Sequence, residues 1–233
     1  MIKIFLTLAL ITNIASFRAS ENPIKQSIAT LESNVGEMEV EMIQLKDGKW
    51  KLRSYLDGGR IVKREEIEYF YLEDNFIRPI EYDFSMKVIL MRKYNASAVF
   101  NWDENKVSYI EKKDKGSVVL EEKVLGPSSA QLQLRLDFRK LDLENIPKIL
   151  KYKVFWRGLI KERIFDIQEN PERVETPIGN YLAYKVSRRY EEDEAKSQVF
   201  WLAPELDFSV IKIFNDDGRR PITVEMKSFK EID

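Results

Sequence analysis

The feature that most constrains the fold is a two-residue alternation of apolar and polar side chains that begins near residue 36 and continues along most of the chain. In "GEMEVEMIQLKDGKWKLRSYL" (36–56), Met38, Val40 and Met42 share one face, and residues 46–48 are typical of a tight turn. Side chains alternate between the two faces of a strand, so this pattern predicts successive β-strands with one buried face. Pro79 is expected at a strand edge or a bend.

The segment 128–141 fits both a helix and a strand. It follows a helix-start signal at 127–129 and is rich in helix formers, which favours a helix. Its large apolar residues nevertheless alternate as in a strand. The whole pattern predicts a mainly β protein, a single antiparallel β domain of roughly ten to twelve strands with one or two short helices. The sheet is expected to form a barrel, a half-barrel or a sandwich.

The N-terminus is typical of a secretory signal. Lys3 precedes an apolar run from Ile4 to Ile11, and small residues follow. The run is too short to span a bilayer. The alternatives are a short uncleaved anchor or a buried N-terminal strand. We therefore expect a signal peptide at 1–20, a polar leader at 21–34, one β-rich domain at 35–233, and a periplasmic location.

The chain contains no cysteine and no histidine. The absence of cysteine excludes disulfides, thiol catalysis, zinc–thiolate sites and anchoring through a lipidated cysteine. Without histidine, Ser-His-Asp, Cys-His and His–metal mechanisms cannot be built from this chain. We predict a non-enzymatic protein without a cofactor or a metal site.

The charges are balanced, with 38 basic and 39 acidic residues and a formal net charge of −1. Nucleic-acid-binding proteins need a basic excess or a basic patch, so no nucleic-acid partner is predicted. No polybasic run in the sequence favours an anionic membrane surface.

Three stretches resemble the DUF 3108 family, exported bacterial proteins of unknown function. They are "IRPIEY" (77–82), "AVFNWDENKV" (98–107) and "ERVETPIGNYLAYKVSRRYEEDEAKSQVFWLAPELDFSVIKI" (172–213). The likeness covers most of 35–230, although Asn101 stands where the family tends to have Asp and Ser209-Val210 replaces a proline-containing pair. The resemblance implies a periplasmic β domain and gives no activity.

The third stretch predicts a hairpin specified by its turn residues. Thr176, Pro177 and Gly179 form the turn, because proline fixes φ and glycine can adopt a positive φ. Pro204 is expected to end the returning strand. The charged tip at 191–194 is interpreted as a solvated loop.

Aromatic and arginine residues supply the candidate ligand-binding site. The candidates are Trp102, Trp156, Trp201, Arg78, Tyr82 and Arg157. The tryptophans suit an apolar cavity or a sugar-stacking surface, and the arginines suit a phosphate or carboxylate group. The alternatives are core or rim packing for the tryptophans and strand-edge charges for the arginines.

Paired carboxylates at 103–104, 191–194 and 216–217 could bind calcium or act as acid and base, but acidic residues are also common in turns.

The favoured function is a non-enzymatic periplasmic protein that binds a lipid or another apolar envelope molecule. The alternative is an envelope scaffold that contacts an envelope protein without a small ligand. A third hypothesis, an enzyme that uses carboxylates, for example on glycans, requires two carboxylates roughly 5–9 Å apart across a cleft.

Overall fold

The computed structural model describes residues 24–91, 93–190, 196–218 and 221–232, so the expected signal peptide and the charged tip lie outside the described residues. The first half of the chain contains β1 (Gln26–Ser33), β2 (Gly36–Gln44), β3 (Trp50–Gly58), β4 (Val62–Glu73), β5 (Phe76–Val88), β6 (Tyr94–Asn101), β7 (Lys106–Glu111) and β8 (Asp114–Val119). The second half contains β9 (Val124–Leu125), α1 (Ser129–Phe138), β10 (Ile149–Trp156), β11 (Leu159–Ile167), β12 (Glu172–Thr176), β13 (Gly179–Arg189), β14 (Ser197–Ala203), the 3-10 helix η1 (Pro204–Leu206), β15 (Ser209–Asp216) and β16 (Ile222–Ile232).

All of these strands belong to one curled sheet, in the order β8-β7-β6-β5-β4-β3-β2-β1-β16-β15-β14-β13-β11-β10-β9, with β12 attached to β13. Neighbours are antiparallel except β9 and β10, which are parallel. The first and last strands pair in the middle of the sheet, so the two meanders join there. The outer strands β8 and β9 are separated by only four residues of chain, which forces the ends of the sheet to approach. The predicted β architecture is thus confirmed in a barrel-like form.

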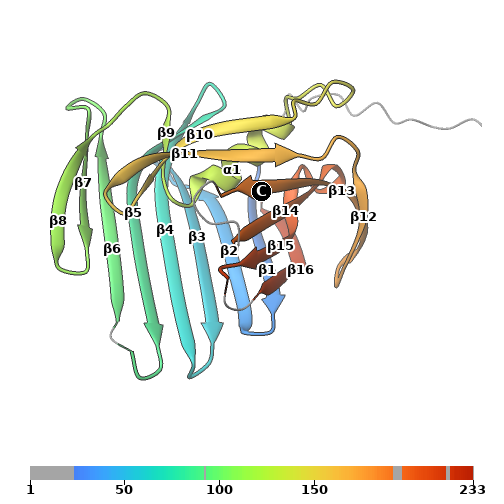
Figure 1. The fold of residues 1–233 in the computed structure, drawn as a ribbon, viewed down its shortest axis with the longest axis horizontal. Coiled ribbons are helices and arrows are strands. Elements are labelled where there is room, and N and C mark those ends of the chain that lie inside the picture. The colour runs from blue at the N-terminus through green and yellow to red at the C-terminus, as the bar shows by residue number, and fades with distance from the viewer. Residues whose placement is uncertain (1–23, 92, 191–195, 219–220, 233) are drawn as a thin grey trace, which may run out of the picture.

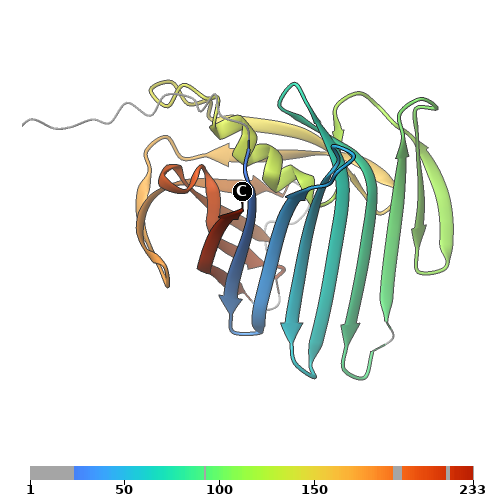
Figure 2. The ribbon, with the colours of Figure 1, turned by 180° about the vertical axis from the view of Figure 1, so that it is seen from behind.

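Helix α1 lies inside the curl, between the wall formed by β1–β8 and the wall formed by β10–β16 (Figures 1 and 2). Leu132, Leu134, Leu136 and Phe138 are all buried, and they contact core residues of both walls. A helix enclosed on every side buries side chains on all its faces. This explains why the sequence pattern of 128–141 resembled a strand, and it confirms the favoured helix interpretation.

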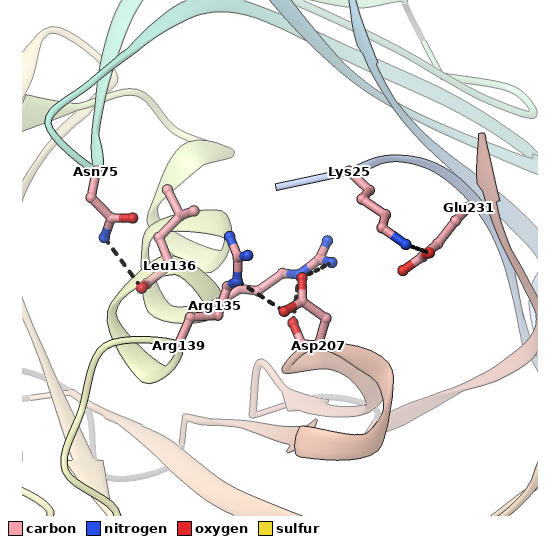
Figure 3. Close-up of polar contacts among 7 residues, drawn as sticks. All are labelled: Lys25, Asn75, Arg135, Leu136, Arg139, Asp207 and Glu231. Carbon is pink, nitrogen blue, oxygen red and sulfur yellow. Dashed lines mark hydrogen bonds and ion pairs between the residues drawn. The ribbon is translucent and has the colours of Figure 1, made fainter. Parts of the chain in front are cut away.

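Polar contacts fix the C-terminal half of α1 to both walls (Figure 3). Arg135 Nη2 and Arg139 Nε each donate to a carboxylate oxygen of Asp207 at 2.9 Å, and both guanidinium groups are buried. On the other wall, Asn75 Nδ2 donates to the carbonyl oxygen of Leu136 at 3.2 Å. The helix is therefore tied to the β4–β5 turn and to the segment between η1 and β15.

The predicted turn chemistry is confirmed in the hairpin. Thr176 Oγ1 donates to the carbonyl oxygen of Gly179 at 3.0 Å, and Gly179 has φ 137°. Pro177 lies in the turn between β12 and β13, and β14 ends at Ala203 where Pro204 opens η1. Pro79 lies in β5 at a register shift, which is the bend expected for it.

Two expectations about the strands need correction. Sixteen strands are present in the described residues, against the ten to twelve expected, because several short strands complete the meander. Residues 26–33, expected within a polar leader, form β1 and pair with β2 and β16. The buried face of β1 carries Ser27, Ala29 and Leu31, while Ile28 lies on the less buried face, so the segment lacks an obvious apolar stripe.

Candidate ligand-binding cleft

A cleft of about 830 Å³ lies between the inner face of β5–β7 and the β10–β11 turn. Alternate residues of β5 line it, namely Tyr82, Phe84, Met86 and Val88, because every second side chain of a strand points to the same face. The predicted residues Trp156 and Arg157 lie at the opposite side with Phe155. Three of the six candidate residues, Tyr82, Trp156 and Arg157, thus meet in one cleft.

Tyr94 is the centre of a cluster of aromatic and charged groups in this cleft. Its hydroxyl donates to Glu111 Oε1 at 2.7 Å, and its ring meets Phe84 edge-on at 5.5 Å between centroids. Lys112 Nζ and Arg157 Cζ lie 5.4 and 5.8 Å from the ring centroid. Burial, together with the hydrogen bond to Glu111, raises the pKa of the Tyr94 hydroxyl. The ring therefore stays neutral and attracts cations to its faces.

The β10–β11 turn needs a glycine next to the aromatic wall. Arg157 and Gly158 both have positive φ, at 51° and 73°. A Cβ atom at Gly158 would lie 2.4 Å from Cζ of Tyr109, so a larger residue would have to displace the Tyr109 ring and would also be strained at this positive φ. This close approach places Arg157 and Trp156 directly over the inner face of the sheet.

The floor of the cleft leads to buried polar groups. The Tyr82 hydroxyl donates to Glu66 Oε1 at 2.9 Å, and Glu66 also accepts a hydrogen bond from Arg64. Burial raises the pKa of Tyr82, with Glu66 adding to the effect. Tyr82 thus lines the cleft and at the same time connects it to a charged network on β4.

Glu68 lies two residues further along β4, fully buried, and accepts a hydrogen bond from the backbone N–H of Ser128 at 2.9 Å. A carboxylate at this place satisfies a free N–H group at the start of α1. Burial raises the pKa of Glu68 to about 7. A Cβ atom at Gly126 would lie 2.2 Å from Glu68 Oε1, so any larger residue at this position would have to displace the carboxyl group.

Arg163 on β11 projects from the other wall. Burial, and after it the nearby Arg188, lowers the pKa of its guanidinium to about 10. Its Cζ lies 5.8 Å from the ring centroid of Trp156, and it makes no ion pair within the described part of the chain. Arg163 and Arg188 therefore place two positive charges close together on this wall.

The remaining candidate residues lie elsewhere. Arg78 stacks on Trp102 at 5.1 Å and pairs with Glu73, and Trp102 Nε1 donates to the carbonyl oxygen of Pro79 at 2.7 Å. Trp102 lies in the turn after β6 and not in a strand.

Trp201 lies on β14, where its Nε1 donates to Glu172 Oε1 at 2.6 Å between two lysines. For Trp102, Trp201 and Arg78, the packing and charge-pairing alternatives describe these contacts better than a shared ligand site.

The paired carboxylates at 103–104 and 216–217 lie in turns or at strand ends, and those at 191–194 lie outside the described residues. Within the described ranges, no group of three or more acidic side chains is close enough to hold a metal ion. In the same residues, no helix has the length and apolar character needed to cross a bilayer.

Sequence reasoning missed Tyr94, Phe84 and Glu111, which form the centre of the cleft. The sequence indicates only that these three residues lie on the inner face of strands, a position that they share with many core residues. They are recognised as part of a site only when the β10–β11 turn is placed over them.

Comparison with known proteins supports the fold. The chain is similar to a crystal structure of a beta-barrel-like protein of domain of unknown function DUF1849 from Brucella abortus, with a TM-score of 0.58 and 8% identity over 90% of this chain and 99% of that chain. No family model matches the chain. No curated protein matches it either. The likeness establishes a barrel-like β fold, and the resemblance to DUF 3108 stays a prediction.

Proposed function

We propose that this protein is a non-enzymatic binding protein of the periplasm, and that its cleft holds an amphipathic molecule with an apolar chain and an acidic head group. The cleft of about 830 Å³ carries the proposal. Small-molecule sites usually measure about 300–1,000 Å³ and combine apolar walls with a few polar groups.

The lining favours this class of ligand. Phe84, Met86, Val88, Tyr109 and Phe155 supply apolar and aromatic surface. The charged residues around them are Lys93, Lys112, Lys113, Arg157, Glu111 and Asp114. Because four are basic and two acidic, the cleft attracts an anionic head group more than a cationic one. Arginine and lysine bind carboxylate and phosphate groups through charge-assisted hydrogen bonds.

The periplasmic location rests on the signal-like N-terminus and on the resemblance to the exported DUF 3108 family. A lipid or another envelope molecule is the expected source of such a ligand. The DUF1849 protein is itself described as a domain of unknown function, so it supplies no ligand class.

The test begins with the exported protein, purified without detergent, extracted with organic solvent and analysed by mass spectrometry against a matched control protein. A stoichiometric lipid or acidic apolar metabolite is expected. Binding is then measured with parinaric acid, a fluorescent fatty acid, for the native chain and for Ala96→Trp, which fills the cleft from β6.

The matched control is Val99→Trp, on the same strand but on the outer face, where Val99 is exposed. We expect Ala96→Trp to weaken parinaric acid binding about tenfold, equivalent to about 1.4 kcal/mol, and Val99→Trp to leave it unchanged. Equal binding by all three proteins, or a clean extract together with no parinaric acid binding, would refute the cleft as the binding site.

An envelope scaffold is the second candidate function. Among the residues that the structure describes, the outer strand β8 pairs only with β7, and Val119 at its end is 74% exposed. A free strand edge is a template for pairing with an extended segment of another protein. Proximity labelling in the envelope should then recover a reproducible partner whose capture is lost when β8 carries a proline.

A further inference from the structure

Two neighbouring turns form an exposed apolar surface at one end of the sheet. Ile61 lies between β3 and β4, and Ile89, Leu90 and Met91 lie between β5 and β6. The backbone N–H of Ile89 donates to the carbonyl oxygen of Ile61 at 2.8 Å, which holds the two turns together. Leu90 is fully exposed, and the other three are between 52% and 67% exposed. We call these four residues the apolar tip.

The apolar tip lies far from the helix. The β3–β4 and β5–β6 turns are at the lower end of the long strands in Figure 1, where they project beyond the turns on either side, while α1 is at the upper end. Figure 2 shows the same projection from behind. Large apolar side chains gathered at a projecting end contribute little to the core, and exposed apolar patches mark interaction sites.

The backbone at the tip points to the same conclusion. Leu90 has φ 61°, in the left-handed region that glycine adopts freely and that costs other residues about 1–2 kcal/mol. The turn would therefore form more easily with glycine at this position. The chain instead places a fully exposed leucine side chain there.

Basic residues surround the apolar tip. Arg60, Lys63, Lys87 and Lys93 are all exposed, and we call them the basic rim. Lys63 and Lys87 lie directly opposite each other on β4 and β5, an arrangement that is unfavourable for folding because like charges repel. Asp57 pairs with Lys63 at 3.2 Å, so the rim keeps a positive excess.

We infer that the apolar tip and the basic rim dock this protein on the surface of an anionic phospholipid bilayer. Leu90 and its apolar neighbours enter the boundary between head groups and acyl chains, as apolar side chains of interfacial segments do. The basic rim contacts the lipid phosphates, since clustered lysine and arginine residues are attracted to anionic leaflets. A bilayer supplies an apolar layer for the apolar tip and, outside that layer, a negatively charged surface for the basic rim.

The docked orientation also places the cleft near the lipid. Met91 of the tip and Lys93 of the rim line the cleft as well, together with Val88. The mouth of the cleft therefore opens next to the docking surface. Docking rests on the tip and rim alone, so it holds whether or not the cleft binds a lipid.

The first experiment is co-sedimentation of the purified protein with vesicles of phosphatidylcholine, and with vesicles of phosphatidylcholine and phosphatidylglycerol in equal parts. We expect binding to the anionic vesicles that falls as salt rises, because surface charges are screened. Ile89→Ser combined with Leu90→Ser should weaken this binding about tenfold, and so should Lys87→Glu combined with Lys93→Glu.

Matched controls lie away from the tip. Val119→Ser removes an exposed apolar side chain on β8, and Lys106→Glu with Lys148→Glu reverses two exposed charges elsewhere. These controls should bind as the native protein does. Circular dichroism checks that every variant is folded.

Insertion can be read directly because the chain has no cysteine. Leu90→Cys and Val119→Cys each give one labelling site for an environment-sensitive fluorophore. On anionic vesicles the label at 90 should shift to the blue and be quenched by nitroxide lipids, and the label at 119 should not.

Three results would overturn the inference. They are no binding to anionic vesicles, equal binding by the tip and control variants, and a dimer in solution that dissociates when Ile89→Ser and Leu90→Ser are combined. The last result would make the tip a contact between two copies of the chain.

Discussion

The buried carboxyl group of Glu68 should make the stability of this protein fall as the pH rises from acid to neutral. Its pKa is raised from an ordinary value of 4.5 to about 7, mainly by burial. Between these values the folded protein holds a proton that the unfolded chain releases. The free energy of unfolding therefore decreases with rising pH, because the folded state binds more protons.

The size of the effect follows from the same values. A rise in pKa from 4.5 to about 7 corresponds to about 3 kcal/mol of folding free energy. This contribution is present below about pH 4.5 and is lost by the time the pH passes about 7. Glu68→Gln keeps an oxygen that accepts from the Ser128 N–H and cannot ionise.

The assay is urea unfolding followed by tryptophan fluorescence at a series of pH values between about 5 and 8. We expect Glu68→Gln to be more stable than the native protein by about 1 kcal/mol or less near pH 5, and by about 3 kcal/mol near pH 8. Glu104→Gln, in an exposed turn, serves as the control and should leave the pH dependence unchanged. A stability difference between Glu68→Gln and native protein that stays constant with pH would refute the reasoning.

Three further substitutions test the packing around α1 and the apolar tip by the same unfolding assay. Asp207→Asn removes the carboxylate that pairs with the buried Arg135 and Arg139 and should destabilise the fold by about 3 kcal/mol or more, whereas Glu162→Gln, which breaks an exposed ion pair, should cost about 1 kcal/mol or less. Gly126→Ala places a methyl group against the Glu68 carboxyl and should cost about 1–3 kcal/mol; no loss would show that the chain can move aside there. Leu90→Gly should not lower stability, because it relieves a left-handed residue, yet it should weaken vesicle binding; a clear loss of stability would contradict the strain assigned to that turn.

Local sequence patterns predicted the elements that have one buried face and the turns that are specified by their own residues. Strands with one buried face alternate as expected, and the Thr176–Gly179 turn follows from its residue types. The pattern failed for β1, whose buried face uses Ser27 and Ala29, because Ala29 packs in a cluster with the small residues Ala183 and Ala203. It was ambiguous for α1, because enclosure on all sides removes the helical apolar stripe.

The sites were harder to predict because they form between segments far apart in the sequence. Tyr82 and Arg157 were identified as candidates, but nothing in the sequence places the β10–β11 turn over the inner face of β5–β7. The basic rim was missed for the same reason. Arg60 and Lys93 come from separate turns, so neither belongs to a polybasic run, and only the pairing of β4 with β5 brings them to one end of the sheet.

The position of α1 determines where the cleft begins. Pro127 lines the cleft, and the next residue, Ser128, donates its N–H to Glu68. The carboxyl group that holds the start of the helix therefore lies next to Pro127, one lining residue of the cleft. A change at Glu68 would alter stability and cleft shape together, and its effect on ligand binding could not be assigned to either one. Ala96 lies on β6, away from the start of the helix, so a cleft-filling substitution there separates binding from the anchoring of α1.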